Sequence, residues 1–134
     1  MRLLTRDSDY AVRALCHIAG SAKRVVATSE LDTHVGVPRP FLRKILQVLQ
    51  RKKILTSFRG KGGGFALRRD PATVSLAEVM AIFQGPFVAS ACLQEKDVCA
   101  RSGSCSLRAK LVSIDRFVNR ELAAVNIADL CGRR

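Results

Sequence analysis

Apolar residues recur at three- and four-residue spacing through residues 10–49, a periodicity typical of amphipathic helices. Three helices are predicted: one that ends near Gly20, a short one from Thr28 to His34, and one that begins near Pro40. Asp7 or Ser8 is the expected cap of the first helix, and Thr28 that of the second. The expected core faces are Tyr10, Ala11, Ala14, Leu15 and Ile18 in the first helix and Phe41, Leu42, Ile45, Leu46 and Leu49 in the third.

The tripeptide Gly36-Val37-Pro38 separates the second and third helices. Glycine suits the positive φ of a tight turn, and two short helices joined in this way predict a helix-turn-helix. Residues 54–58 and 65–67 are short strand candidates on either side of a glycine-rich run, residues 59–64. We therefore expect a β-hairpin after the third helix, as in a winged helix-turn-helix.

The second half of the chain predicts two further helices. Ser75 and Glu78 have the spacing of a capping box, and the helix that they open stops at Gly85-Pro86. From Ser106 to about residue 125 the apolar positions again follow helical spacing. This long apolar stripe could close the core of the monomer, but in so short a chain we expect it to form a homodimer.

The expected fold is therefore mainly α with a small β-hairpin. Residues 1–70 form a winged helix-turn-helix region. Residues 71–134 supply a connecting helix, a cysteine loop at about residues 86–105 and a dimerisation helix at about residues 106–125.

Charge indicates the kind of partner. The chain has 134 residues, about one domain, with 23 Lys and Arg against 11 Asp and Glu, a net charge of +12. Residues 39–69 hold ten of these cations and no acid. Such a surface favours a polyanion, with an anionic membrane surface as the alternative. No apolar run is long enough to span a bilayer and no signal peptide is evident, so we expect a cytoplasmic protein that does not bind membranes.

Double-stranded DNA fits the charge and the fold together. The second helix of a helix-turn-helix places its N-terminal residues in the major groove, which here presents Arg39, Arg43 and Lys44. Arg59 and Lys61 add charge at the tip of the hairpin. A nucleotide-binding phosphate loop is disfavoured, because no Gly-Lys-Ser/Thr ends the glycine run and a strand follows it.

Three cysteines, Cys92, Cys99 and Cys105, stand within 14 residues. The gaps of six and five residues are wider than those common in structural zinc sites, whereas thiolates are the usual ligands of iron-sulfur clusters. A metal-free redox switch on the same thiols is the alternative. Cys16 is expected in the core, and Cys131 has no assigned role. No constellation of catalytic residues is evident around His17 or His34, so we do not expect an enzyme.

These features together resemble the Rrf2 family of bacterial transcription regulators. The resemblance rests on Met1-Arg2-Leu3, Tyr10-Ala11-Val12, the turn at residues 36–38, the run Arg59-Gly60-Lys61-Gly62-Gly63-Gly64-Phe65, the cysteine triplet and Ile127-Ala128-Asp129-Leu130. It spans nearly the whole chain. It implies a homodimeric DNA-binding regulator whose affinity for an operator is controlled by a 4Fe–4S or 2Fe–2S cluster on Cys92, Cys99 and Cys105.

The resemblance also suggests a fourth ligand. In IscR-like members a histidine follows the third cysteine by three residues, but Arg108 stands there and stays protonated, so it cannot bind iron. In NsrR-like members an aspartate on the first helix of the opposite subunit completes the site, and Asp9 holds the matching position. Another branch uses a histidine near the helix-turn-helix, which makes His34 a further candidate. The expected ligand set is Cys92, Cys99, Cys105 and Asp9.

Overall fold

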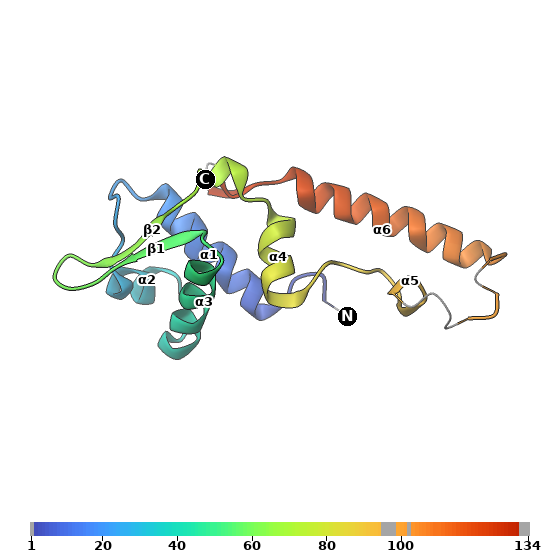
Figure 1. The fold of residues 1–134 in the computed structure, drawn as a ribbon, viewed down its shortest axis with the longest axis horizontal. Coiled ribbons are helices and arrows are strands. Elements are labelled where there is room, and N and C mark those ends of the chain that lie inside the picture. Colours follow the sequence, from blue (N-terminus) through green and yellow to red (C-terminus); the bar gives the residue numbers. More distant parts are fainter. Residues whose placement is uncertain (1, 95–98, 102, 132–134) are drawn as a thin grey trace.

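The structure is a computed structural model that describes residues 2–94, 99–101 and 103–131 (Figure 1). Its helices are α1 (Arg6–Gly20), α2 (Thr28–His34), α3 (Arg39–Arg51), α4 (Leu76–Gln84), α5 (Ala91–Gln94), α6 (Ser106–Ala124) and α7 (Ile127–Cys131), and its strands are β1 (Leu55–Phe58) and β2 (Gly64–Leu67). A 3-10 turn, η1 (Pro71–Thr73), precedes α4. The predicted fold class, mainly helical with one antiparallel hairpin, is confirmed.

The core lies where α1 crosses α3, because both helices bury one apolar face. The buried apolar side chains of these helices are Ala11, Ala14, Leu15 and Ile18 on α1 and Leu42, Ile45, Leu46 and Leu49 on α3. Phe41 departs from the expected stripe, since it is 40% exposed. It lies at the edge of the apolar face, where the guanidinium of Arg6 stands 5.0 Å from its ring centroid.

Hydrogen bonds to a side chain of α4 fix the first turn of α1. The cap is Thr5, whose hydroxyl accepts from the amide of Ser8 at 3.4 Å, so the expectation of Asp7 or Ser8 as cap is wrong. Ser8 is instead a buried helical residue that donates its hydroxyl to Gln84 Oε1 at 2.7 Å. The amide of Thr5 donates to the same oxygen at 2.9 Å. One half-buried amide on α4, that of Gln84, thus fixes the start of α1.

The expected cap of α2, Thr28, is also wrong, because the helix begins one residue earlier than that cap implies. Ala27 precedes α2 and Thr28 is its first helical residue, without a side-chain cap. The chain here is set by a bridge to the hairpin: the amide of Val26 donates to Phe65 O at 2.8 Å, and the amide of Phe65 donates to Val26 O at 2.9 Å. A backbone bridge to β2, rather than a side-chain cap, fixes the entry into α2.

The hairpin pairs β1 with β2 in the register Leu55↔Leu67 to Phe58↔Gly64, with residues 59–63 as its tip. Gly60 and Gly62 have φ values of +86° and +79°, which glycine adopts without strain. Gly64 packs against Val26 so closely that a Cβ would lie 2.1 Å from its carbonyl oxygen. Glycine at this position therefore allows the hairpin to lie on the segment that leads into α2.

The second half of the chain contains α4, α6 and α7, and its last helix packs against α1. The predicted capping contact of α4 is present, as Ser75 Oγ accepts from the amide of Glu78 at 3.0 Å. The long helix α6 extends away from the core as an arm beside α5, and of its described side chains only Leu122 is buried (Figure 1). The chain then turns back through α7, whose Ile127 is fully buried in the same core as α1. The sequence did not indicate α7.

Across the described ranges, no helix has both the length and the apolarity that a bilayer span requires.

Candidate nucleic-acid interface and cysteine segment

The turn between α2 and α3 fixes the angle of the second helix. Gly36 adopts a φ of +70°, as expected, while Val35 and Val37 on either side of it are buried. Arg39, in the first turn of α3, donates its Nε to Asp32 Oδ2 of α2 at 2.7 Å. This ion pair joins the two helices, yet the Arg39 side chain keeps 61% of its surface exposed.

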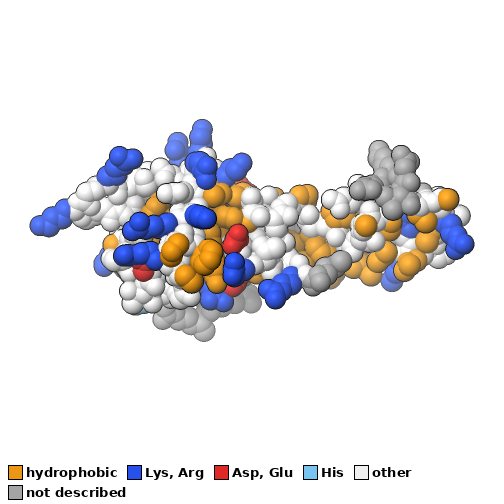
Figure 2. Space-filling model, turned by 90° about the horizontal axis from the view of Figure 1, so that it is seen from below, with side chains coloured by type: hydrophobic (Ala, Val, Ile, Leu, Met, Phe, Trp, Pro, Cys, Tyr) orange, Lys and Arg blue, Asp and Glu red, His pale blue; other side chains and the backbone are white. Residues whose placement is uncertain are grey.

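The outer surface of this region is cationic. Arg43 and Lys44 are exposed on α3 because Leu42 and Ile45 face the core, and Arg59 and Lys61 are exposed at the hairpin tip. Within the described part of the chain, none of these four cations forms an ion pair. We call Arg43, Lys44, Arg59 and Lys61 the basic face. Figure 2 shows Lys and Arg side chains gathered over this end of the molecule with few acids among them.

A groove lies between the helix-turn-helix and the hairpin. It is bounded by Thr28 and Ser29 at the start of α2, Gln47 and Gln50 on α3, and Arg59 at the tip. Its walls therefore offer hydroxyl, amide and guanidinium groups, all of which hydrogen-bond to phosphate oxygens. The groove places the recognition helix and the hairpin tip around one concave surface.

Arg69 belongs to the cationic run of the sequence but not to this surface. Its guanidinium forms an ion pair with Glu78 of α4 and donates to the carbonyl of Thr73 at 2.7 Å. The hydrogen bond to Glu78 raises the pKa of Arg69 above its ordinary value. Arg69 thus ties the hairpin to α4, whereas Arg6 beside Phe41 is a cation near the start of α3 that the sequence did not indicate.

The cysteine segment, residues 86–105, carries the three predicted thiol ligands. Cys92 is half-buried on α5, where its Sγ lies 3.3 Å from Ser90 Oγ, and Cys99 is exposed. Cys105 caps α6, its sulfur accepting from the amide of Arg108 at 3.4 Å. Residues 95–98 lie outside the described ranges.

The structure does not bring the expected ligands together. Among the described residues, no group of three or more His, Cys, Asp and Glu side chains is arranged to hold a metal ion. Asp9 lies on α1 and pairs with Arg13 Nη2 at 2.9 Å. His34 stacks on His17, with ring centroids 5.3 Å apart. A cluster on these residues needs a different arrangement of the cysteine segment or a second subunit.

His17 also joins α1 to α2. Its Nε2 lies 3.2 Å from Glu30 Oε1, and Lys23 Nζ lies 3.5 Å from Glu30 Oε2. The hydrogen bond with His17, followed by the charge of Lys23, holds the pKa of Glu30 below its ordinary value. The Glu30 contacts therefore favour the native state above the ordinary pKa of a glutamate and are lost as the pH falls below it.

The arm has two different faces. Asp115 Oδ1 accepts from the amide of Ala89 at 2.7 Å, and Asn119 Nδ2 donates to Phe87 O at 3.1 Å, so one face of α6 holds the cysteine segment. Three large apolar side chains are exposed along α6: Leu107 at 67%, Ile114 at 43% and Phe117 at 56%. Figure 2 shows hydrophobic side chains on the arm.

A helix-turn-helix followed by a hairpin with a cationic tip defines a winged helix-turn-helix protein. The chain belongs to the Rrf2 family, because the family model described as an iron-dependent transcriptional regulator matches residues 4–133.

Two curated relatives cover most of the chain. One, named as an rrf2-like HTH-type transcriptional regulator of Rhodobacter capsulatus, is 31% identical over an alignment of 115 residues that covers 79% of this chain and 77% of that protein. The other, protein aau3 of Rhizobium meliloti, is 32% identical over 109 residues, which are 81% of this chain and 71% of that protein.

Solved structures share the fold. CymR, the global cysteine regulator of B. subtilis, superposes with a TM-score of 0.81 at 15% identity, covering 98% of this chain and 97% of CymR. IscR of T. potens superposes with a TM-score of 0.75 at 18% identity, covering 96% of this chain and 85% of IscR. The family model and the R. capsulatus relative are described as transcriptional regulators, and CymR as a regulator, which confirms the expectation that this chain is not an enzyme.

Proposed function

We propose that the protein is a homodimeric, sequence-specific DNA-binding transcriptional regulator whose affinity for its operator is controlled by the cysteine segment. The observation that carries the DNA-binding part is the basic face, which places four exposed cations on α3 and the hairpin tip. Residues 1–70 bind the duplex and residues 71–134 sense and dimerise. A gel-shift titration with duplex DNA tests binding, and absence of a shifted complex would contradict it.

The two parts of the basic face contact different parts of the duplex. Arg43 and Lys44 project from α3 and meet bases or phosphates of the major groove, while Arg39 is oriented by Asp32 toward the same groove. Arg59 and Lys61 reach the neighbouring minor groove or its phosphates. An arginine in a narrow minor groove favours A/T-rich sequence, so Arg59 contributes to sequence preference as well as to affinity.

The exposed apolar side chains of α6 support the dimer. Leu107, Ile114 and Phe117 leave a large apolar area exposed on the arm, an arrangement more typical of an interface than of a monomer surface. Two copies joined along this face are related by a two-fold axis and present two recognition helices to a two-fold operator.

We expect the Phe117→Glu variant to be monomeric at concentrations where the wild type is dimeric, because a buried carboxylate in an apolar interface is strongly unfavourable. Size-exclusion chromatography with light scattering measures the mass. Ala109→Glu is the matched control, since Ala109 is an exposed residue of the same helix that helical periodicity places away from this apolar stripe. A monomeric wild type, or equal disruption by both variants, would contradict the assignment.

The cysteine segment fits an iron-sulfur cluster by the chemistry of its donors. Cys92, Cys99 and Cys105 are each at least partly exposed, and Cys105 sits at the N-terminus of α6, where negative charge is stabilised. In this proposal these thiols and Asp9 of a second subunit would hold the cluster. A bound cluster would supply a centre sensitive to oxidants, nitric oxide or iron supply.

The chain's own contacts supply a route from this segment to the DNA. Asp115 and Asn119 attach residues 87–89 to α6, and α6 packs on α4. Gln84 at the end of α4 holds the first turn of α1, and α1 packs against α3. A movement of the cysteine segment is therefore transmitted through α6, α4 and α1 to α3, the recognition helix. Coupling between such sites is typically about 1–3 kcal/mol, or about 5- to 150-fold in affinity.

We expect protein purified without air to contain iron and sulfide and to absorb in the visible region, whereas Cys99→Ser loses both. Cys99 is exposed and outside the core, so the variant keeps the fold and its unfolding transition. Cys16→Ser is the matched control that retains the iron. If wild-type protein purified anaerobically is colourless and contains no iron, the protein does not bind a cluster.

A metal-free thiol switch on the same fold is the second candidate. It is supported by the exposure of Cys99, by the separation of the expected ligands in one chain, and by the structural likeness to CymR of Staphylococcus aureus in its oxidized form, with a TM-score of 0.76 at 13% identity. In that case the protein contains no iron, and its affinity for DNA changes on treatment with peroxide and returns with a thiol reductant.

A further inference from the structure

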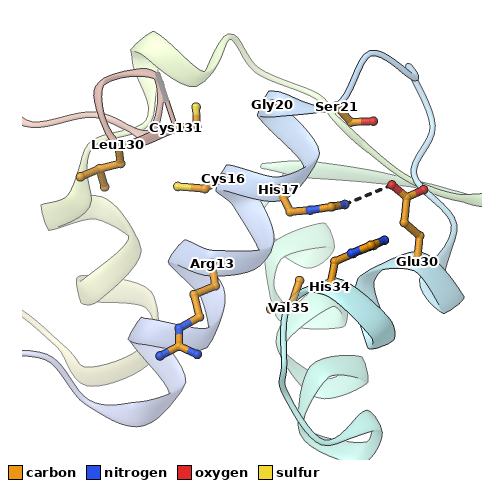
Figure 3. A pocket seen from close by; sticks show the side chains of 10 residues that line it. All are labelled: Arg13, Cys16, His17, Gly20, Ser21, Glu30, His34, Val35, Leu130 and Cys131. Carbon is orange, nitrogen blue, oxygen red and sulfur yellow. Dashed lines mark hydrogen bonds and ion pairs between the residues drawn. The ribbon is translucent and has the colours of Figure 1, made fainter. Parts of the chain in front are cut away.

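Two cysteines outside the cysteine segment come together although they stand near opposite ends of the sequence. Cys16 lies on α1 and Cys131 on α7, and these helices pack against each other. Both thiols are half-buried at the edge of the core. Figure 3 shows Cys16 extending from α1 toward the side of the pocket where Leu130 and Cys131 lie.

The two thiols share an open pocket. Its lining comes mainly from α1, α2 and α7 and includes Arg13, Cys16, His17, Glu30, His34 and Cys131 (Figure 3). A small molecule can therefore reach the sulfur atoms. Neither thiol belongs to the expected cluster ligands.

We propose that Cys16 and Cys131 form a dithiol that exchanges with low-molecular-weight disulfides and closes to an intramolecular disulfide between α1 and α7. The Cys131 thiolate attacks a sulfur of the small disulfide, forms a mixed disulfide and releases one small thiol. The Cys16 thiolate then attacks the Cys131 sulfur, forms the Cys16–Cys131 bond and releases the second small thiol. The protein loses two electrons and two protons, and the small disulfide gains them.

The environment of each thiol assigns the order of the steps. Burial, followed by the proximity of the Cys131 thiol, raises the pKa of Cys16 to about 11. Because only a thiolate attacks, Cys16 is the slow, resolving thiol at neutral pH. Cys131, whose thiol donates to Ile127 O at 2.9 Å within α7, carries the first step because Cys16 is the slower of the two thiols. The closing step therefore accelerates as the pH rises above neutrality, because burial keeps Cys16 mostly protonated there.

The bond would link residues near opposite ends of the sequence. It closes a loop of nearly the whole chain and so restricts the unfolded state strongly. It also fixes α7, which follows the arm, to α1, which supports the recognition helix. The oxidised protein therefore unfolds at a higher temperature than the reduced protein, and Cys131→Ser does not show this rise.

The test is incubation of the wild-type protein with oxidised glutathione, followed by mass spectrometry of tryptic peptides. A Lys or Arg separates every neighbouring pair of the five cysteines, so each thiol is read on its own peptide. We expect the Cys16 and Cys131 peptides to be joined with loss of two hydrogens, and dithiothreitol to separate them. Peptides that stay reduced, carry glutathione separately or join to Cys92, Cys99 or Cys105 would overturn the proposal.

Two variants test the order independently of the wild-type mapping. Cys16→Ser is expected to stop at a glutathione adduct on Cys131, and Cys131→Ser to leave Cys16 largely unreacted. A rapid adduct on Cys16 in Cys131→Ser would overturn the assignment of Cys131 as the attacking thiol. The unfolding transition of each reduced variant confirms that both are folded.

Discussion

The affinity of the proposed dimer for duplex DNA is expected to fall steeply with salt. Four free cations per subunit on the basic face correspond to about eight neutralised phosphates per dimer, so the logarithm of the association constant falls against the logarithm of salt with a slope near −7. From about 50 to 200 mM salt the affinity then drops about ten-thousandfold. Fluorescence anisotropy with labelled duplex over this range measures the slope.

Two pairs of substitutions show whether the salt dependence of DNA binding comes from the basic face or from the total charge of the protein. Arg43→Ala with Lys44→Ala removes two phosphate contacts per subunit and is expected to reduce the slope to about −4. Arg116→Ala with Arg120→Ala removes the same charge from exposed positions on the arm and should leave the slope near its wild-type value. Equal reductions by both pairs would mean that total charge, not this surface, governs binding, and a flat salt response would exclude the binding mode altogether.

Gly64→Ala is expected to lower the free energy of unfolding by about 2–6 kcal/mol. The φ of Gly64 is +156°, and a Cβ there would lie 2.1 Å from Val26 O and 2.7 Å from Val26 C. Backbone cannot yield as a flexible side chain does, so the Val26–Phe65 bridge must open. The strained dihedral costs about 1–3 kcal/mol and each of the two lost hydrogen bonds about 0.5–1.5 kcal/mol. Urea unfolding followed by circular dichroism measures the change.

Gly60→Ala is the matched control for that variant. Gly60 also has a positive φ, +86°, but nothing lies within 4 Å of its added Cβ. Its cost is that of the dihedral alone, about 1 kcal/mol. If the two variants were equally destabilised, the close approach of Gly64 to Val26 would not matter to stability. The difference between them isolates the anchoring of the hairpin to the segment before α2.

The local features of the fold could be predicted from the sequence because they follow from short-range patterns. Helical spacing identified α1, α3 and α6, Gly36 marked the turn, and the glycine run marked the hairpin tip. The helix caps were harder to predict from the sequence. Thr5 and Asp7 both have side chains that can cap a helix, and the contact that supports Thr5 comes from Gln84, which is remote in sequence. The Val26 bridge and α7 depend on tertiary contacts that have no local signature.

The same division holds for the candidate site. The cations Arg43, Lys44, Arg59 and Lys61 are exposed, and the position of exposed groups on a helix or a hairpin tip follows from periodicity. Arg69 could not be separated from them, because its partner Glu78 lies on another element. The assignments of Asp9 and the three cysteines to one site stay predictions. The proximity of Cys16 to Cys131 required the fold.

The return of α7 to α1 has a consequence for biosynthesis. Ile127 belongs to the same core as α1, and α7 packs against α1 and η1, so these elements emerge from the ribosome with part of their apolar surface uncovered. That surface is covered only after the arm has been translated and α7 has followed it. A nascent chain that already carries every cation of the basic face therefore has an incomplete core, and premature termination before residue 127 yields a fragment prone to proteolysis rather than a smaller DNA-binding protein.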